Sequence, residues 1–261
     1  MTSSPALMYH DVVESGAEDA SGFPGRDAAL YKVSPDTFDE HLRAIIVSVP
    51  SPTITFDDGG ASAMRAANAL EKYALRGYFF ITANYIGTPG FVDADDLREL
   101  CRRGHIVGSH SCTHPLRMGH CTWQRLLDEW QRSRDIISTI VGRTISTASV
   151  PGGDFAPKVA EAAARAGFKF LFTSEPSAET YHAFGMTVRG RFTVQRWTTA
   201  STAAALARGE WLPCARQAFV WNAKKLSKRL GGEQYLRVRR LLLRHGNDVE
   251  WGDQIASGGR S

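Results

Sequence analysis

Three features are scarce or missing in this chain of 261 residues, and each excludes a class of protein. The four cysteines show no CxxC spacing, and the chain is too long to depend on disulfide staples, so a reducing compartment is expected. No run of about eighteen apolar residues occurs, so no membrane-spanning helix is expected. The first nine residues show no basic stretch followed by a signal-length apolar run. We therefore expect a cytoplasmic protein.

A strong excess of one charge is also missing. The chain carries 31 basic and 27 acidic residues, a formal net charge of +4. Nucleic-acid-binding domains have a pronounced basic excess, so nucleic acid is not an expected partner. Small molecules or glycans are the expected partners.

Short apolar or β-branched runs alternate with longer amphipathic stretches, which is typical of β/α units around a parallel sheet. Strands are predicted at residues 7–10, 53–56, 78–81, 106–109, 147–150, 170–173 and 193–196. Helices are predicted to begin at Ser34 and to cover about 61–74, 94–103, 122–141 and 157–166. Four glycines follow helical stretches, where a left-handed residue can end a helix: Gly77, Gly104, Gly142 and Gly167. The pattern predicts an α/β fold, a distorted, incomplete (β/α) barrel of about seven parallel strands with a C-terminal helical extension.

The chain becomes helical and basic from about residue 203, which predicts a barrel domain over 1–202 and a basic helical extension over 203–261. Helices with a solvated basic face packed on the barrel are the first interpretation. Peripheral attachment to an anionic membrane, on its cytoplasmic face, is the alternative. In a β/α barrel the loops after the strands converge on one face and carry the chemistry. Residues 16–30 are predicted to form a long loop over that face, with an ordinary surface connection as the alternative.

The first candidate motif is Thr55-Phe56-Asp57-Asp58-Gly59-Gly60, where a predicted strand ends in two carboxylates. Adjacent acids repel each other unless a cation or a proton shares the site, so the pair favours a metal. A simple Asp-Gly turn is the competing interpretation.

The second candidate motif follows another predicted strand and contains His110 and His114. Histidines at i and i+4 lie on one side of a helical turn, so both imidazoles can reach one ion. One carboxylate and two imidazoles leave a coordination position open for water, as hydrolytic zinc sites do.

Together, the TFDDG strand end and the HSxxH turn resemble the two hallmark motifs of the polysaccharide deacetylases, carbohydrate esterases built on the NodB-homology domain. The resemblance covers about residues 7–196. It implies that Asp57 is the general base and that Asp58, His110 and His114 bind a divalent metal, zinc first, with cobalt, nickel or manganese as alternatives. Cys112, between the two histidines, is the competing ligand.

A third family motif, Arg-x-Pro-x-Gly, appears here as Ser149-Val150-Pro151-Gly152-Gly153, without its arginine. In the family that arginine orients the base. Arg196, at the end of the last predicted strand, is the candidate substitute, against an ordinary rim arginine. The resemblance implies that the Gly152 N–H helps to stabilise the oxyanion.

The late family histidine that acts as general acid is also missing from its usual place. His10, at the end of the first predicted strand, resembles the N-terminal histidine of a rearranged branch and is the candidate acid, against a structural role beside Asp11. Glu175, after another strand, is a candidate for orienting the acid or binding sugar hydroxyls. The segments around Ser149 and Glu175 resemble a branch encoded with bacterial surface-polysaccharide assembly.

These features predict a metal-dependent hydrolase that removes an N-acetyl or other N-acyl group from an amino sugar or glycan. The alternatives are a deformylase or another N-acyl hydrolase on a lipid- or nucleotide-linked sugar, a non-catalytic glycan-binding member of the fold, and a structural member of a membrane-associated assembly complex.

Overall fold

The computed structural model describes residues 4–223. Contacts divide the chain into two units, Met1–Ala218 and Phe219–Ser261, and the first contains the barrel. Within residues 4–223, no helix is both long enough and apolar enough to cross a membrane.

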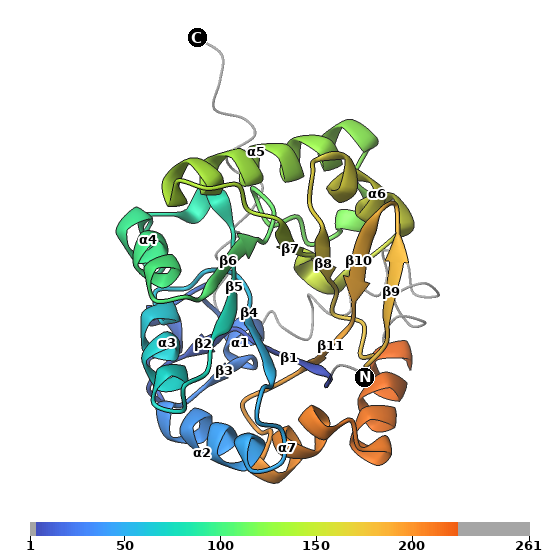
Figure 1. The fold of residues 1–261 in the computed structure, drawn as a ribbon. Helices are drawn as coiled ribbons and strands as arrows, with labels where there is room; N and C mark the ends of the chain where they lie inside the picture. The colour runs from blue at the N-terminus through green and yellow to red at the C-terminus, as the bar shows by residue number, and fades with distance from the viewer. Residues whose placement is uncertain (1–3, 224–261) are drawn as a thin grey trace. The chain divides into compact units, whose positions relative to one another are not determined.

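A nine-stranded sheet forms the inner layer of the barrel (Figure 1). Each strand pairs in parallel with its neighbours except β9, which is antiparallel to β10. In spatial order the strands are β11 (Arg191–Thr193), β1 (Ala6–Tyr9), β4 (Thr53–Phe56), β5 (Gly77–Ile81), β6 (Ile106–Ser109), β7 (Thr147–Ser149), β8 (Phe170–Phe172), β10 (Met186–Arg189) and β9 (Thr180–Ala183). The strands β2 (Asp11–Val12) and β3 (Lys32–Val33) form a separate parallel pair. The predicted α/β architecture is therefore confirmed.

Helices surround this sheet and cover its outer face (Figure 1). They are α2 (Pro35–Ile46), α3 (Ala63–Glu71), α4 (Ala94–Arg102), α5 (Trp123–Val141), α6 (Pro157–Arg165) and α7 (Ala200–Arg208). The single turn α1 (Arg26–Ala29) lies in the connection between β2 and β3. Short 3-10 turns lie at η1 (Glu18–Ala20), η2 (Ala83–Tyr85), η3 (Met118–His120) and η4 (Pro151–Gly153). The sequence-predicted cap of α2 forms, because the Ser34 hydroxyl accepts the N–H of Thr37 at 3.1 Å.

Side chains alternate along the strands between two environments. Those facing outward pack with the helices into the main apolar core, and the inward-facing cluster contains Ala6, Phe80 and Phe172. The inward positions nearest the active end are polar and include Thr55, on β4. The inward face of the sheet is therefore apolar deep in the barrel and polar just beneath the strand ends.

Two local predictions are wrong in position. The last predicted strand, 193–196, lies instead at Arg191–Thr193, so Arg196 falls beyond it. Gly77 does not end a helix but opens β5, where a Cβ atom would lie 2.8 Å from the Leu70 side chain. Ala74, with φ 55°, adopts the left-handed conformation instead. The other three glycines, Gly104, Gly142 and Gly167, have positive φ as predicted.

The predicted domain boundary after residue 202 falls inside α7, which packs against α2. Residues 224–261, most of the predicted basic extension, lie outside the described residues. The division into a barrel and a helical extension stays a prediction.

Candidate active site

The end of β4 sends its two carboxylates in different directions. Asp57 continues the inward side of the strand, and its N–H donates to the Tyr9 carbonyl at 3.1 Å. Asp58 then adopts φ 75°, a left-handed conformation uncommon outside glycine. Because of this turn, two adjacent residues can present their carboxylates to different partners.

A buried carboxylate from α5 holds the turn that carries the two histidines. Glu129 accepts hydrogen bonds from the N–H groups of Cys112 and Thr113, at 2.9 and 2.8 Å, and from the Thr113 hydroxyl. The turn needs this support because Ser111 and His114 both have positive φ, 67° and 57°. Glu129 thus fixes the backbone from which His110 and His114 project.

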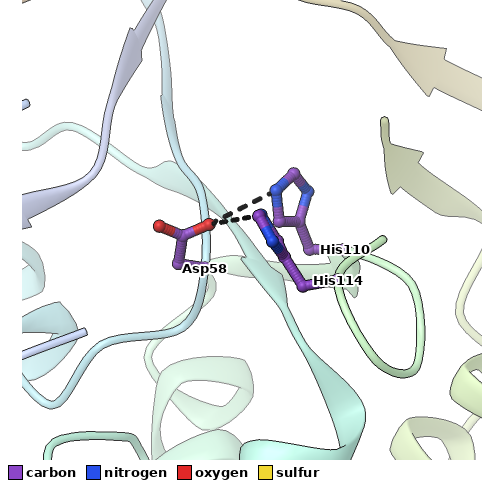
Figure 2. A group of neighbouring side chains, drawn as sticks. All are labelled: Asp58, His110 and His114. Carbon is purple, nitrogen blue, oxygen red and sulfur yellow. Dashed lines mark ion pairs between the residues drawn. The ribbon is translucent and has the colours of Figure 1, made fainter. Parts of the chain in front are cut away.

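Three side chains from these two loops converge, as Figure 2 shows. The Nε2 atoms of His110 and His114 lie 3.4 and 3.3 Å from Oδ1 of Asp58. Two ligands at tetrahedral positions around zinc, each about 2.0–2.1 Å from the ion, are about 3.3–3.4 Å apart. The buried Asp58 Oδ1 also has no hydrogen-bond partner among the described residues. The spacing and the donor set therefore fit one zinc-sized divalent ion.

The remaining nitrogen of His110 fixes its orientation. Nδ1 lies 3.1 Å from the Ser149 carbonyl oxygen, which can only accept, so Nδ1 carries the proton. The lone pair of Nε2 is then directed toward Asp58, as a metal-binding histidine requires. Burial raises the pKa of Asp58, but the adjacent imidazoles of His110 and His114 outweigh burial and hold that pKa well below its ordinary value. Asp58 is therefore ionised, as a carboxylate must be to bind a metal ion.

The guanidinium that holds Asp57 comes from Arg191 at the start of β11. Its two terminal nitrogens lie 2.6 and 2.7 Å from the two carboxylate oxygens of Asp57. The same group donates to the hydroxyls of Thr55 and Ser149, and Nε donates to the Thr173 carbonyl. Arg191 has no exposed surface, and the rings of Phe80 and Phe172 lie 5.6 and 5.9 Å from it. All five of its N–H donors can thus be used inside the barrel.

This pairing decides the charge of Asp57. Burial raises its pKa, but the positive charge and the hydrogen bonds of Arg191 lower it, and the pKa ends below its ordinary value. Asp57 is therefore ionised at neutral pH, as a general base must be.

The prediction that Arg196 replaces the missing family arginine is wrong. Arg196 is half exposed and pairs with Glu18 at 3.6 Å. Its strand ends earlier than predicted, so Arg191 is the inward-facing residue. Ser149 stands where the family has its arginine, and its small side chain leaves space for the Arg191 guanidinium, 2.6 Å away. In the sequence, only one feature could have indicated Arg191: its charged side chain lies close to a predicted strand that is otherwise apolar.

The other predicted residues lie at nearby strand ends. His10 follows β1, its ring contacts the tilted Tyr31 ring with centroids 4.9 Å apart, and its buried Nδ1 has no hydrogen-bond partner among the described residues. Gly152 lies in η4 with φ 65°, where a Cβ would lie 2.5 Å from the Leu116 carbonyl oxygen.

Glu175 follows β8, and its backbone carbonyl accepts a hydrogen bond from the backbone N–H of Arg191 at 3.0 Å. The Cys112 thiol instead donates to Asn84 at 3.0 Å. The roles of His10, Gly152 and Glu175 stay predictions.

The chain is similar to known proteins in both sequence and fold. The sequence model of the family described as polysaccharide deacetylase matches residues 47–171. YxkH of Bacillus subtilis, named as a candidate polysaccharide deacetylase, is 26% identical over 126 residues, which are 48% of this chain and 45% of YxkH. The chain thus spans less than half of that relative.

Two solved structures share the fold. IcaB from Ammonifex degensii has a TM-score of 0.64 at 20% identity, covering 79% of this chain and 98% of IcaB. The Streptococcus pyogenes deacetylase PplD, solved in complex with acetate, has a TM-score of 0.60 at 18% identity, covering 79% of this chain and 97% of PplD. The resemblance seen in the sequence is confirmed by the family model, because residues 47–171 match the polysaccharide deacetylases.

The ligand set predicts that the purified protein binds one zinc ion per chain. His110→Ala, His114→Ala and Asp58→Ala should each weaken zinc binding by at least about tenfold, because each removes one of three protein ligands. Isothermal titration of the metal-free protein measures this. His182→Ala, on the exposed strand β9, is the matched control and should bind as the wild type does. Unchanged affinity in all three ligand variants would show that the ion binds elsewhere.

The Arg191–Asp57 contact predicts strong energetic coupling. Arg191→Met should lower the free energy of unfolding of the metal-free protein by about 3–5 kcal/mol, because it leaves a buried carboxylate without its partner. Adding Asp57→Asn should recover part of that loss, since the unpaired charge is then gone. Denaturant titration measures all three variants. Arg189→Met, a half-buried arginine on β10, should cost less, and additive losses would rule out the coupling.

Proposed function

We propose that the protein is a metal-dependent hydrolase that removes the N-acetyl group of an amino sugar, in the assembly of a bacterial surface polysaccharide. The observation that carries this proposal is the convergence of Asp58, His110 and His114 beside an arginine-held Asp57. The family match of residues 47–171 supports the class of substrate, and the names of YxkH and PplD as deacetylases support deacetylation.

The protein residues divide the work of amide hydrolysis among them. A divalent ion bound by Asp58, His110 and His114 would polarise the amide carbonyl and make water more acidic. Asp57 lies 3.9 Å from Nε2 of His110, close enough to the ligand set to take a proton from an attacking water. Arg191 keeps that carboxylate ionised and fixes both of its oxygens. Oδ1 accepts a hydrogen bond from Arg191 and retains a lone pair that can accept the proton.

Two further groups complete the proposed reaction. The Gly152 N–H donates to the oxyanion that forms when water attacks the carbonyl carbon. His10 then protonates the departing amine, which is a poor leaving group without a proton. Its buried Nδ1 has no hydrogen-bond partner among the described residues, so this atom is available to donate the proton. Glu175 is proposed to orient this acid or to bind sugar hydroxyls.

Acyl release from a substrate panel tests the proposed activity. The panel contains N-acetylated oligosaccharides, nucleotide-linked sugars and lipid-linked sugars, each assayed with zinc, cobalt, nickel and manganese. Acetate release above a metal-free control supports the proposal. Formate as the product would instead identify a deformylase. Glycan binding with bound metal and no release from any substrate would identify a non-catalytic member of the fold.

Asp57→Asn should lower turnover by at least about 10²-fold while zinc stays bound, because the amide cannot accept the proton of water. Zinc content and the melting temperature are measured alongside turnover, since the change also removes the partner of Arg191. Near-normal turnover in a folded, zinc-bound variant would show that another group is the base.

His10→Ala should lower turnover on amides by about 10²-fold and affect activated aryl esters much less, because an aryl oxide leaves without protonation. The comparison of kcat for an N-acetyl sugar and an aryl acetate measures this difference. His182→Ala is the control for loss of an imidazole far from the strand ends. Equal losses on both substrates would assign His10 a structural role.

A further inference from the structure

Residues 16–31 bring two aromatic rings against the functional histidines. The Phe23 ring lies 4.7 Å from the His114 ring, and the Tyr31 ring lies 4.9 Å from the His10 ring, measured between centroids. Both aromatic residues are half buried. The loop therefore contacts the metal-ligand set on one side and the proposed acid on the other.

A buried ammonium group ties this loop together. The Nζ of Lys32, on β3, donates to the carbonyls of Glu18, Ser21 and Phe23 at 2.6, 2.5 and 2.7 Å. Its side chain is only 2% exposed. An ammonium has three protons, and each has a carbonyl here. Three carbonyls around one positive charge resemble the oxygen cage of a bound cation, with the lysine supplying the charge.

The same network reaches the strand end that carries Asp58. The buried Asp11 carboxylate lies 3.8 Å from the Lys32 ammonium and accepts from the hydroxyls of Ser21 and Ser62, at 2.6 and 2.7 Å. It also packs directly on Gly60, two residues beyond Asp58, where a Cβ would lie 2.1 Å from Asp11 Oδ1. The loop and the turn that carries Asp58 thus both contact the buried charge pair of Lys32 and Asp11.

Burying two charges is a costly way to gain stability, because desolvation offsets much of their attraction. Such a pair is better explained by the arrangement that it enforces. We propose that Lys32 is a positioning residue: its ammonium holds residues 18–23 so that Phe23 packs against His114 and keeps that imidazole directed toward the Asp58–His110–His114 site. This inference rests on the proposed ligand set but not on the proposed substrate.

The test uses the full chain and three changes. Lys32→Met removes the ammonium with little change in length. Asp11→Asn with Lys32→Met removes both charges, so no unpaired charge remains, but the three carbonyls still lack their donor. Phe23→Leu removes the ring and leaves the Lys32 network intact. Lys72→Met, an exposed lysine just after α3, is the matched control for loss of a positive charge.

Two measurements need no substrate. In both Lys32 variants we expect tryptic cleavage after Arg26, which is exposed next to the held segment, to accelerate by about tenfold or more, because the loop opens locally more often. Zinc affinity should fall by about tenfold in both Lys32 variants and in Phe23→Leu, the size of effect typical of residues that orient metal ligands. Adding Lys32→Met to Phe23→Leu should cause little further loss of affinity, because both act through one ring.

The outcomes separate positioning from simple stabilisation. A doubly neutral variant with wild-type melting temperature but weak zinc binding and fast cleavage supports the proposal. Wild-type zinc affinity in that variant overturns it. If neither Lys32 variant folds, Phe23→Leu decides, since unchanged zinc affinity there also overturns the proposal. A wild-type protein that binds zinc tightly but releases no acyl group contradicts only the proposed function.

Discussion

The buried pair of Arg191 and Asp57 is the contact on which the rest of the active end depends. Arg191 lies on β11, and its guanidinium donates to residues that lie on or directly follow β4, β7 and β8. One fully buried cation therefore links strand ends from opposite parts of the barrel. Its removal would leave a buried carboxylate and several hydroxyls and carbonyls without a partner, which is costly in a medium of low polarity. The ionised state of Asp57 and the alignment of the strand ends thus have the same physical origin.

The two loops that carry the metal-ligand set are stabilised by complementary charges. Glu129 accepts hydrogen bonds from backbone N–H groups of the histidine turn. Lys32 donates hydrogen bonds to backbone carbonyls of the loop that contacts His114. Each buried charge replaces the water that these backbone groups would otherwise need. Irregular backbone can therefore adopt one conformation next to the site, although neither loop belongs to the sheet.

Much of the fold followed from the sequence because its signals are local. The strand before Asp57 and the cap at Ser34 depend on a few neighbouring residues, and both formed as predicted. The arginine beside Asp57 is different, because the two residues are 134 positions apart and meet only through strand order. Because the last strand lies closer to the N-terminus than predicted, Arg191 and not Arg196 is the arginine that pairs with Asp57. Likewise, nothing in the sequence around Lys32 indicates that its carbonyl partners lie 9 to 14 residues earlier.

The left-handed backbone at Asp58 also limits how this position can change over evolutionary time. A φ of 75° is readily accepted by glycine, asparagine and aspartate and resisted by longer or β-branched residues. Holding a divalent ion at the end of β4 requires an ionised oxygen donor, which glycine and asparagine lack. Glutamate would keep the charge but fits this backbone poorly. The two requirements overlap at aspartate, so the shape of the chain and the chemistry of the ion select the same residue independently.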